Sequence, residues 1–290
     1  MPKHIVIDAR HWRDFGIGTH VRNLLAALVR LPDQGGFRYS VVASPGDEED
    51  ILSCAPEVRI APYPHTDRGL HHNILFPLFV RKLRPDLSHI PLNSVAYWMP
   101  RPYVVTIHDM SSLLYPQHGD VREVLHEERY RRGALRAGRV IAVSNSTRRD
   151  LESVVRVPAD RIRTVYGAPD PVYTSTATPA EFDTALLERY SIRFPFVLYA
   201  GTIRPHKNVT RLVEAFAVVR GELANHPEFK DLRLVILGDE LSKYPAVRRA
   251  VAASRVEPYV RFLGFVPQET LKVFYRAATV FAFPSLYEGF

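Results

Sequence analysis

Three basic side chains are clustered where an apolar run gives way to a helical pattern in the second half of the chain. Residues 200–208 (AGTIRPHKN) place Arg204, His206 and Lys207 just after the run that ends at Gly201. A diphosphate that leaves a sugar gains negative charge as its bond breaks, and fixed cations with oriented backbone amides stabilise such charge. The pattern therefore favours a phosphate-binding turn, and the alternative is a solvated basic turn.

A glycine pair opens the first helical pattern of the chain. Gly16 and Gly18 in FGIGTHVRNLL follow the first apolar run. Glycines at a helix N-terminus let backbone N–H groups approach a phosphate, and the helix dipole adds about half a positive charge there. A dinucleotide fingerprint is absent, since Val21 stands where its third glycine would be and no acid ends the second strand. A tight turn that needs glycine is the alternative.

Two further polar residues follow apolar runs. His108 in TIHD stands at the carboxyl end of a predicted strand, where ligands bind in open α/β sheets. A neutral histidine there can hydrogen-bond a sugar hydroxyl or accept a proton, and the alternative is a structural residue that caps the following loop. Glu288 precedes Gly289 in FPSLYEGF, which suits hydroxyl recognition; by itself it is only a loop acid.

Other chemistries find little support. His65, His71 and His72 lack carboxylates at ligand spacing, so we interpret them as surface histidines and predict no metal site. The single cysteine, Cys54, excludes an internal disulfide and fits a reducing compartment. No apolar run is long enough for a membrane span. Clustered aromatics and cations typical of a nucleic-acid interface are absent, so no nucleic-acid partner is expected.

The elements that carry these residues alternate between apolar runs and helical patterns, which predicts doubly wound parallel sheets. Strands are predicted in the first half at residues 4–9, 39–44, 86–90, 103–109, 139–144 and 161–166. Helices are predicted there at residues 19–31, 73–83, 121–135 and 146–155. Strands are predicted in the second half at residues 194–201, 232–238, 259–264 and 279–285, with helices between them.

A linker rich in Pro, Ser and Thr separates the two halves. The 290 residues suggest two domains, and we place them at 1–178 and 179–290. The first is the predicted acceptor side and the second the predicted nucleotide-binding domain. Because the sequence stops just after an apolar strand, we expect part of a sheet face to be bare and the chain to be a fragment.

Five motifs in this order resemble glycosyltransferase family 4, the retaining sugar-nucleotide enzymes of GT-B fold. They are the glycine loop at 16–25, TIHD at 106–116, IAVSNSTRRDL at 141–151, the turn and LVEAF helix at 196–216, and the stretch from 260 to 290. The last is the most specific, because we know of no other family that combines F-L-G-x-V with F-P-S-x-x-E-G-F. The resemblance implies two Rossmann-like domains that face each other, with the second incomplete.

The resemblance also implies roles for single residues. Gly16 and Gly18 face the donor diphosphate, and His108 hydrogen-bonds the transferred sugar. Lys207 and a nearby arginine hold the diphosphate, and Glu288 contacts the donor sugar as the first of two glutamates.

This sequence departs from the family pattern at two points. The second glutamate, which holds the nucleotide ribose in the family, would lie beyond Phe290. Relatives carry their arginine where Thr202 and His206 stand here, so Arg204 is the candidate substitute. No metal or other cofactor is implied, because these cations would stabilise the leaving group.

The donor implied by relatives with this glycine loop and turn is GDP-mannose, and the acceptor is a glycan or a lipid-linked glycan. The chain has 38 basic and 31 acidic residues, a net charge of +7 that favours anionic partners. Phe76, Phe79 and the basic end of the 73–83 helix suggest peripheral contact with an anionic membrane, on its cytoplasmic face. A core helix with solvated ends is the alternative there. For the whole protein, the alternative to an enzyme is a non-catalytic or degenerate sugar-nucleotide-binding module.

Overall fold

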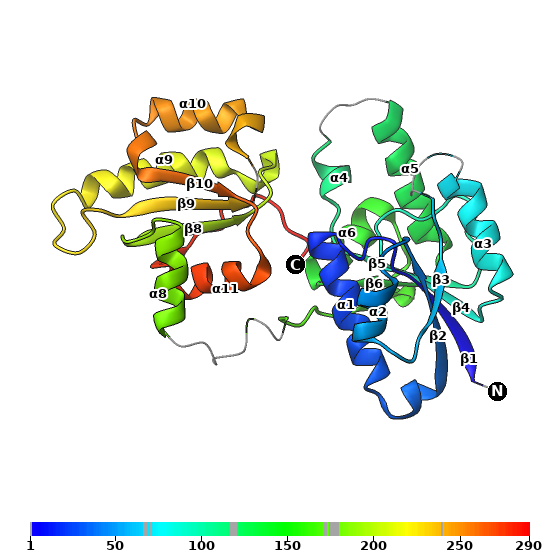
Figure 1. Cartoon of the computed structure of the whole chain (residues 1–290). Coiled ribbons are helices and arrows are strands. Elements are labelled where there is room, and N and C mark those ends of the chain that lie inside the picture. The colour runs from blue at the N-terminus through cyan, green and yellow to red at the C-terminus, as the bar shows by residue number, and fades with distance from the viewer. Residues whose placement is uncertain are drawn as a thin grey trace. The chain divides into compact units, whose positions relative to one another are not determined.

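A computed structural model describes residues 2–65, 69, 71–116, 121–170, 173, 180–238 and 240–290. The chain divides into two compact units. Unit 1 comprises Met1–Ala168 with Gly289–Phe290, and unit 2 comprises Pro169–Glu288. The predicted boundary between residues 178 and 179, and most of the predicted linker, lie outside the described residues. Each unit is an α/β structure built on a parallel sheet, as predicted (Figure 1).

Unit 1 is built on a seven-stranded sheet of order β3-β2-β1-β4-β5-β6-β7, in which every neighbouring pair is parallel. The strands are β1 (Lys3–Asp8), β2 (Phe37–Ala43), β3 (Arg59–Pro62), β4 (Leu87–Ile90), β5 (Tyr103–Ile107), β6 (Arg139–Ala142) and β7 (Ile162–Thr164). Six of them confirm predicted strands. Strand β3 was not predicted, because its four residues include Arg59 and Pro62 and are typical of a loop. Proline is tolerated there because β3 is an edge strand.

The helices of unit 1 follow the predicted alternation. They are α1 (Phe15–Val29), α2 (Glu48–Cys54), α3 (Phe76–Lys82), α4 (Ser111–Leu114), α5 (Val121–Arg136) and α6 (Asn145–Asp150). The predicted helix at 73–83 is divided into a π-helical turn, His71–Leu75, and α3. Pro77 lies in the first turn of α3, where its missing N–H costs no hydrogen bond.

The π-helical turn corrects one prediction about the histidines. His65 and His71 are exposed and their rings stack at 4.6 Å, but His72 is buried, with its ring parallel to Phe76. Residues four apart share a helix face, so the burial of Phe76 turns His72 inward as well. His72 is therefore a core residue rather than a surface one.

Unit 2 contains a four-stranded parallel sheet of order β10-β9-β8-β11. Its strands are β8 (Phe196–Gly201), β9 (Arg233–Gly238), β10 (Val260–Gly264) and β11 (Val280–Phe281). Its helices are α8 (Ala180–Arg189), α9 (Val209–Glu222), α10 (Pro245–Ala253) and α11 (Gln268–Ala277). Figure 1 shows α9 and α10 on one face of this sheet and α8 and α11 on the other.

Two apolar clusters fill the space between this sheet and its helices. Leu234 and Ile236 of β9 pack with Val213 of α9, while Val235 of the same strand packs with Phe274 of α11. Successive side chains of a strand point to opposite faces, so a strand covered on both sides is apolar at every position. This is why β9 reads LVIL in the sequence.

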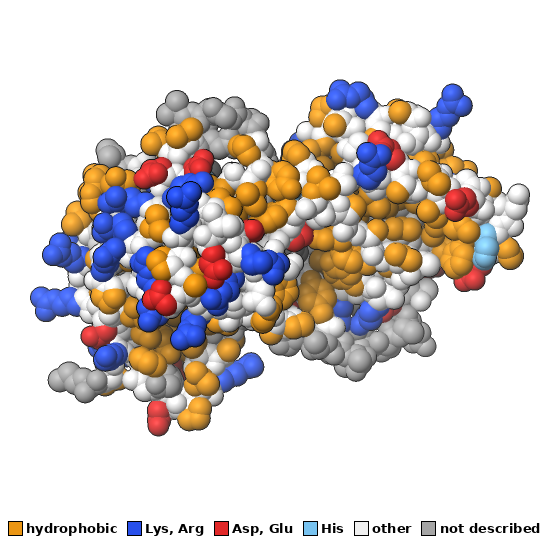
Figure 2. All heavy atoms as spheres, turned by 180° about the vertical axis from the view of Figure 1, so that it is seen from behind, with side chains coloured by type: hydrophobic (Ala, Val, Ile, Leu, Met, Phe, Trp, Pro, Cys, Tyr) orange, Lys and Arg blue, Asp and Glu red, His pale blue; other side chains and the backbone are white. Residues whose placement is uncertain are grey.

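Strand β11 is an exposed edge of the second sheet. Val280 and Phe281 are half exposed, and an apolar groove of about 500 Å³ runs beside the strand between Val197, Phe216 and Val219. The predicted bare apolar surface near the end of the sequence is therefore present. On the face shown in Figure 2, hydrophobic side chains dominate over unit 2, whereas Lys and Arg side chains are gathered over unit 1. Within the described residues, no helix has the length and hydropathy to cross a bilayer.

The carboxyl ends of β8 and β9 approach each other closely. Gly201 and Gly238 are register partners, and Gly238 has φ +129°, a value that favours glycine. A Cβ on Gly238 would overlap the carbonyl oxygen of Gly201. We predict that Gly238→Ala lowers the free energy of unfolding by more than about 2 kcal/mol, because it adds backbone strain and this overlap.

Urea titration of the full chain measures this change. The matched control is Gly221→Ala in α9, where a Cβ meets nothing within 4 Å and should stabilise the helix by up to about 1 kcal/mol. Equal stability of Gly238→Ala and the wild type would contradict the close approach.

A histidine links two central strands of unit 1. His89 Nε2 of β4 lies 2.8 Å from Thr106 Oγ1 of β5. Burial, with the neighbouring His20 and His108, lowers the pKa of His89 to about 4. An unfolded histidine titrates near 6.5, so the unfolded chain binds this proton first as the pH falls. The stability that His89 contributes is complete above about pH 6.5 and is lost between pH 6.5 and 4.

We therefore expect unit 1 to lose stability on acidification by at most about 1.4 kcal/mol per pH unit for this histidine. Thermal unfolding from pH 8 to pH 4.5 tests it. His89→Gln should flatten the dependence below pH 6.5, whereas His71→Gln, at an exposed position, should leave it unchanged. An identical slope in all three proteins would show that His89 does not titrate as described.

Candidate active-site residues

The predicted basic turn of unit 2 connects β8 to α9. The Lys207 amide donates to the Arg204 carbonyl over 2.9 Å, and the Asn208 amide donates to the Pro205 carbonyl over 3.1 Å. Asn208 adopts the left-handed conformation, with φ 57° and ψ 33°, which asparagine tolerates better than most residues. The chain thereby reverses direction at Asn208 and α9 begins at Val209.

Lys207 and Glu288, which lie 81 residues apart in the chain, form an ion pair in this unit. Lys207 Nζ lies 2.5 Å from Glu288 Oε1 and 2.6 Å from Oε2. The two side chains are 17% and 31% exposed. The ammonium also lies 5.2 Å from the centre of the Phe283 ring, which places it within cation–π range. The structure thus joins two predicted site residues, with the cation held between a carboxylate and an aromatic ring.

The loop that carries Glu288 is attached to the basic turn by several contacts. The Leu286 amide donates to the His206 carbonyl over 2.7 Å, and Asn208 Nδ2 donates to the Pro284 carbonyl over 3.3 Å. The Phe283 ring stacks against Tyr199 of β8 at 5.8 Å. These contacts fix the loop relative to the strand end, so the Lys207–Glu288 pair is supported from both sides.

The other predicted residues of unit 2 lie near this pair. Gly201 is the last residue of β8, directly before the turn. Arg204 begins the turn and its side chain is exposed, so the guanidinium is accessible to an anion. Two cations and the first backbone amides of α9 are therefore located at the carboxyl end of β8. Such an arrangement can bind and stabilise a phosphate-bearing leaving group.

His108 lies at the carboxyl edge of the unit 1 sheet, one residue beyond β5. Its backbone amide donates to Asn93 Oδ1 over 2.9 Å, and its Nε2 lies 3.2 Å from the Pro91 carbonyl oxygen. A carbonyl only accepts, so Nε2 carries the proton and Nδ1 is the acceptor in the neutral ring. Burial lowers the pKa of His108, against the opposing effects of the Pro91 carbonyl and Asp109, and keeps the ring neutral near pH 7.

Helix α1 contributes a second histidine to this edge. The His20 ring meets the His108 ring edge to face, with centroids 4.8 Å apart. Burial and the neighbouring His108 lower the pKa of His20 to about 4. Two neutral imidazoles in contact can exchange hydrogen bonds with hydroxyl groups, which suits a polar, uncharged ligand such as a sugar.

The two glycines of α1 differ in their surroundings. A Cβ on Gly18 would overlap the carbonyl oxygen of Trp12, so this glycine lets α1 approach the loop after β1. A Cβ on Gly16 would meet nothing within 4 Å. The open space at Gly16 leaves the backbone of the first turn accessible, and Gly18 also has a packing reason to be glycine.

Several residues around these sites were missed in the sequence analysis. His20 stands inside the glycine motif itself, two residues after Gly18. It is one helical turn beyond Gly16 in α1, and this spacing was the available signal. Asn208 directly follows Lys207 in the sequence, and the Phe283 ring lies within cation–π range of the Lys207 ammonium. Asn93 gave no sequence signal, since it belongs to a loop. Among the residues that the structure describes, no group of three or more His, Cys, Asp or Glu side chains could hold a metal ion.

Comparisons with known proteins agree with these features. The family model described as glycosyltransferase family 4 matches residues 16–172, and the model described as glycosyl transferases group 1 matches residues 191–290. The O-antigen chain mannosyltransferase B of Escherichia coli is 30% identical over 190 residues, which cover 64% of this chain and 48% of that protein. The serotype-specific mannosyltransferase WbdA of E. coli is 26% identical over 155 residues, 53% of this chain and 19% of that protein. The matched part of the chain thus spans about half the length of the first relative and about a fifth of the length of the second.

Solved structures share the fold at low identity. Anabaena Alr3699/HepE, solved in complex with UDP and glucose, has a TM-score of 0.67 at 17% identity, covering 99% of this chain and 76% of that one. WaaG, a glycosyltransferase involved in lipopolysaccharide biosynthesis, has a TM-score of 0.67 at 15% identity, with the same coverage. The two Rossmann-like units are therefore those of a GT-B fold. On the strength of the family match over more than half its length, this chain belongs to glycosyltransferase family 4.

Proposed function

We propose that the whole protein transfers a sugar from a nucleoside diphosphate sugar to a hydroxyl of an acceptor, with retention of configuration. The observation that carries this proposal is the Lys207–Glu288 pair on the basic turn after β8. A diphosphate there would compete with Glu288 for the Lys207 ammonium and would leave the carboxylate available for hydroxyl groups of the donor sugar.

The leaving group is stabilised by the protein itself in this proposal. Lys207 and Arg204 neutralise the diphosphate as the glycosidic bond breaks, and the amides at the start of α9 add partial positive charge. The reaction then needs no metal ion, and the departing phosphate helps to deprotonate the acceptor hydroxyl. No pair of carboxylates of the glycosidase type is required.

Unit 1 contributes hydrogen bonds rather than charge. The neutral His108 ring accepts a hydrogen bond from a hydroxyl of the transferred sugar at Nδ1, because Nε2 already donates to Pro91. Gly16 and Gly18 bring the first turn of α1 to the donor diphosphate. The open space above Gly16 supports this role more directly than the packed position of Gly18 does.

The donor we propose is GDP-mannose, and the acceptor a glycan or a lipid-linked glycan in polysaccharide biosynthesis. Two curated relatives bear the name mannosyltransferase, which supports the sugar. The UDP bound in solved neighbours supports a nucleotide donor in general, since those structures are too distant to indicate the base. We place the reaction in the cytoplasm, at the surface of an anionic membrane, and the single cysteine suits a reducing compartment.

The prediction that Phe76 contributes to a membrane contact is wrong. Phe76 is 1% exposed, so it belongs to the core of unit 1 and cannot face a membrane. The ring packs under the Arg10 guanidinium, whose carbon lies 3.6 Å from the ring centre. Ile74 and Leu75 of the π-helical turn and Leu78 of α3 are instead the exposed apolar residues of this segment.

Nucleotide binding tests the class of donor. We expect GDP to raise the melting temperature of the full chain more than UDP or ADP at equal concentration, because a ligand that binds only the folded state stabilises it. Labelled GDP-mannose then separates an enzyme from a non-catalytic module. Transfer of label to acceptor that continues in EDTA supports a metal-independent enzyme, whereas binding without turnover supports the module.

Replacement of Lys207 tests its role directly. Lys207→Ala should reduce transfer at least ~100-fold, which corresponds to about 2.7 kcal/mol of lost transition-state stabilisation. Lys207→Arg should retain more activity than Lys207→Met, because only the first keeps the charge. Initial rates with saturating donor give these values.

The matched control is Lys243→Ala, an exposed lysine of the same unit that pairs with Glu240 at 3.5 Å. It should change the transfer rate less than about threefold, as surface pairs contribute little. Near-normal turnover by Lys207→Ala would refute the assigned role of Lys207.

A further inference from the structure

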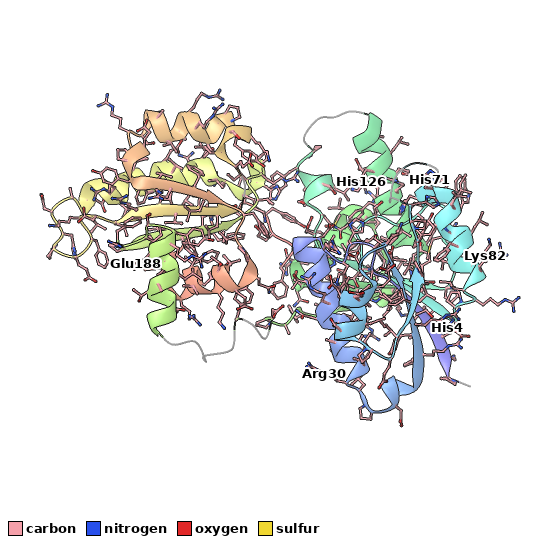
Figure 3. The ribbon with its side chains drawn as sticks, viewed as in Figure 1. His4, Arg30, His71, Lys82, His126 and Glu188 are labelled. Carbon is pink, nitrogen blue, oxygen red and sulfur yellow. The ribbon has the colours of Figure 1, made fainter. Side chains whose placement is uncertain are left out.

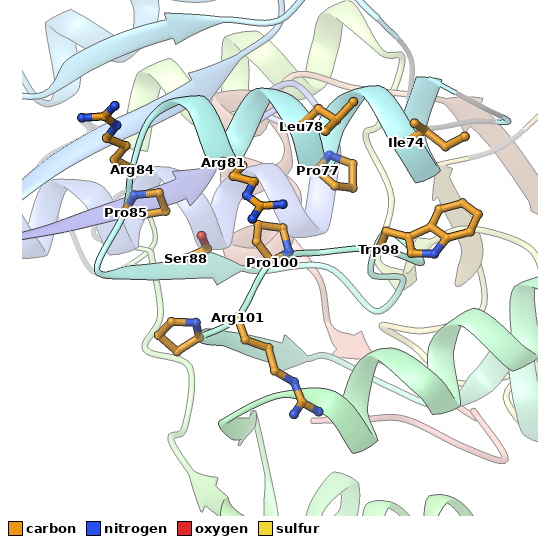
Figure 4. A pocket seen from close by; sticks show the side chains of 11 residues that line it. Ile74, Pro77, Leu78, Arg81, Arg84, Pro85, Ser88, Trp98, Pro100 and Arg101 are labelled. Carbon is orange, nitrogen blue, oxygen red and sulfur yellow. The ribbon is translucent and has the colours of Figure 1, made fainter.

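A pocket of about 750 Å³ lies in unit 1 between α3 and the segment that leads into β5. It is bordered by α3, by residues at the starts of β4 and β5, and by the loop between these two strands (Figure 4). His108 lies beyond the opposite, carboxyl end of β5. His108 is not among the residues that line the pocket. The pocket is therefore separate from the residues assigned to sugar transfer.

The floor of this pocket contains a polar group without a partner. Ser88 of β4 is 1% exposed, and its Oγ has no hydrogen-bond partner among the described residues. Figure 4 shows the hydroxyl directed from β4 toward α3. Buried hydroxyls are normally satisfied, so an unsatisfied one that lines a pocket points to a ligand with hydrogen-bonding atoms.

The pocket is also positively charged. Arg81 extends from α3 across the pocket toward Pro100, whereas Arg84 and Arg101 lie at its margins (Figure 4). None of the eleven described residues that line it is acidic. A guanidinium can form two parallel hydrogen bonds to a phosphate group, so the charge and the Ser88 hydroxyl favour the same kind of anion.

Apolar side chains make up most of the lining. Seven of the eleven residues are Ile, Leu, Trp or Pro. Trp98, Leu78 and Ile74 are 57%, 49% and 37% exposed, unusually high for large apolar residues at one place. Tryptophan is typical of membrane interfaces, where its ring lies at the depth of the headgroups. A free phosphate would leave this surface uncovered, whereas a phosphate with hydrocarbon chains would cover it.

We propose that this pocket binds the headgroup phosphate of an anionic phospholipid. Arg81 and the Ser88 hydroxyl donate hydrogen bonds to its oxygens, Arg84 and Arg101 surround it with positive charge, and Trp98, Leu78 and Ile74 contact the start of its acyl chains. The inference deepens the proposed membrane contact and rests on it, but it does not depend on the transfer reaction.

Vesicle flotation of the full chain tests whether the positive charge of the pocket contributes to lipid binding. Each basic residue near an anionic surface contributes about fivefold to partitioning, so Arg81→Gln/Arg101→Gln should weaken binding to phosphatidylglycerol vesicles about 25-fold. The control is Arg30→Gln/Arg163→Gln, which removes the same charge from exposed positions of unit 1; Arg30 is well separated from Lys82 of α3 in Figure 3. The control should change binding less than threefold. An equal loss in both double variants would leave net charge alone as the cause and overturn the pocket.

Ser88→Ala tests the specific contact. It should weaken binding to phosphatidylglycerol vesicles severalfold without lowering the melting temperature, because the hydroxyl it removes has no partner in the protein. Unchanged vesicle binding by Ser88→Ala would contradict the proposed hydrogen bond.

Calorimetry separates a lipid from a free anion. Dihexanoyl phosphatidylglycerol, below its micelle concentration, should bind the wild type and bind the Arg81 and Ser88 variants more weakly. Inorganic phosphate that binds equally tightly would identify a free-anion site and overturn the lipid assignment. The stabilisation by GDP is measured on every variant. Its absence with lipid binding intact would contradict only the proposed GDP-linked donor. Stabilisation by GDP without lipid binding would contradict only this pocket.

Discussion

The candidate site of the second unit depends on keeping one cation, Lys207, fixed in the turn after β8. A lysine side chain in water is mobile and strongly hydrated, so it holds an anion poorly unless the protein restrains it. Here the restraint comes from a carboxylate on one side and an aromatic ring on the other. The loop that supplies both is tied to the turn through His206 and Asn208. The contacts that fix this loop are thus also the contacts that position the proposed phosphate-binding cation.

In each unit the candidate site residues lie at the carboxyl edge of the sheet, but the two sets of residues suit different ligand groups. In the proposed reaction, the cations of unit 2 face a leaving group that becomes more negative as its bond breaks. Unit 1 contains histidines whose pKa values are lowered by burial, and in the proposed reaction these neutral rings face uncharged hydroxyl groups. A protonated imidazole could not accept the hydrogen bond that a sugar hydroxyl donates. The division of roles follows from the burial of His20 and His108 rather than from their residue type.

Much of this could be predicted from the sequence, because parallel strands covered on both faces leave a strong signal. The runs that became β1, β5, β8 and β9 are nearly continuous in apolar residues, and a glycine or a polar residue stands at or just after the carboxyl end of each. Short elements were harder to predict. Strand β3 has too few apolar residues to distinguish it from a loop, and the break before α3 reflects how His72 and Phe76 pack.

Contacts between distant residues could not be predicted from spacing at all. Glu288 by itself was only a loop acid, and its pairing with Lys207 requires the strand order of the second sheet, with β11 beside β8. The contact between His20 and His108 likewise depends on how α1 packs against the edge of the first sheet. The pocket around Ser88 had no sequence signal, since a small residue in an apolar strand is unremarkable until its hydroxyl is found without a partner.

The claim that Lys207 exists to hold a donor's phosphates is tested most directly by a crystal structure of the full chain with GDP-mannose. We expect a diphosphate oxygen within hydrogen-bond distance of Lys207 Nζ, with the Glu288 carboxylate released toward the sugar. Nucleotide bound elsewhere, with the Lys207–Glu288 pair intact, would contradict it.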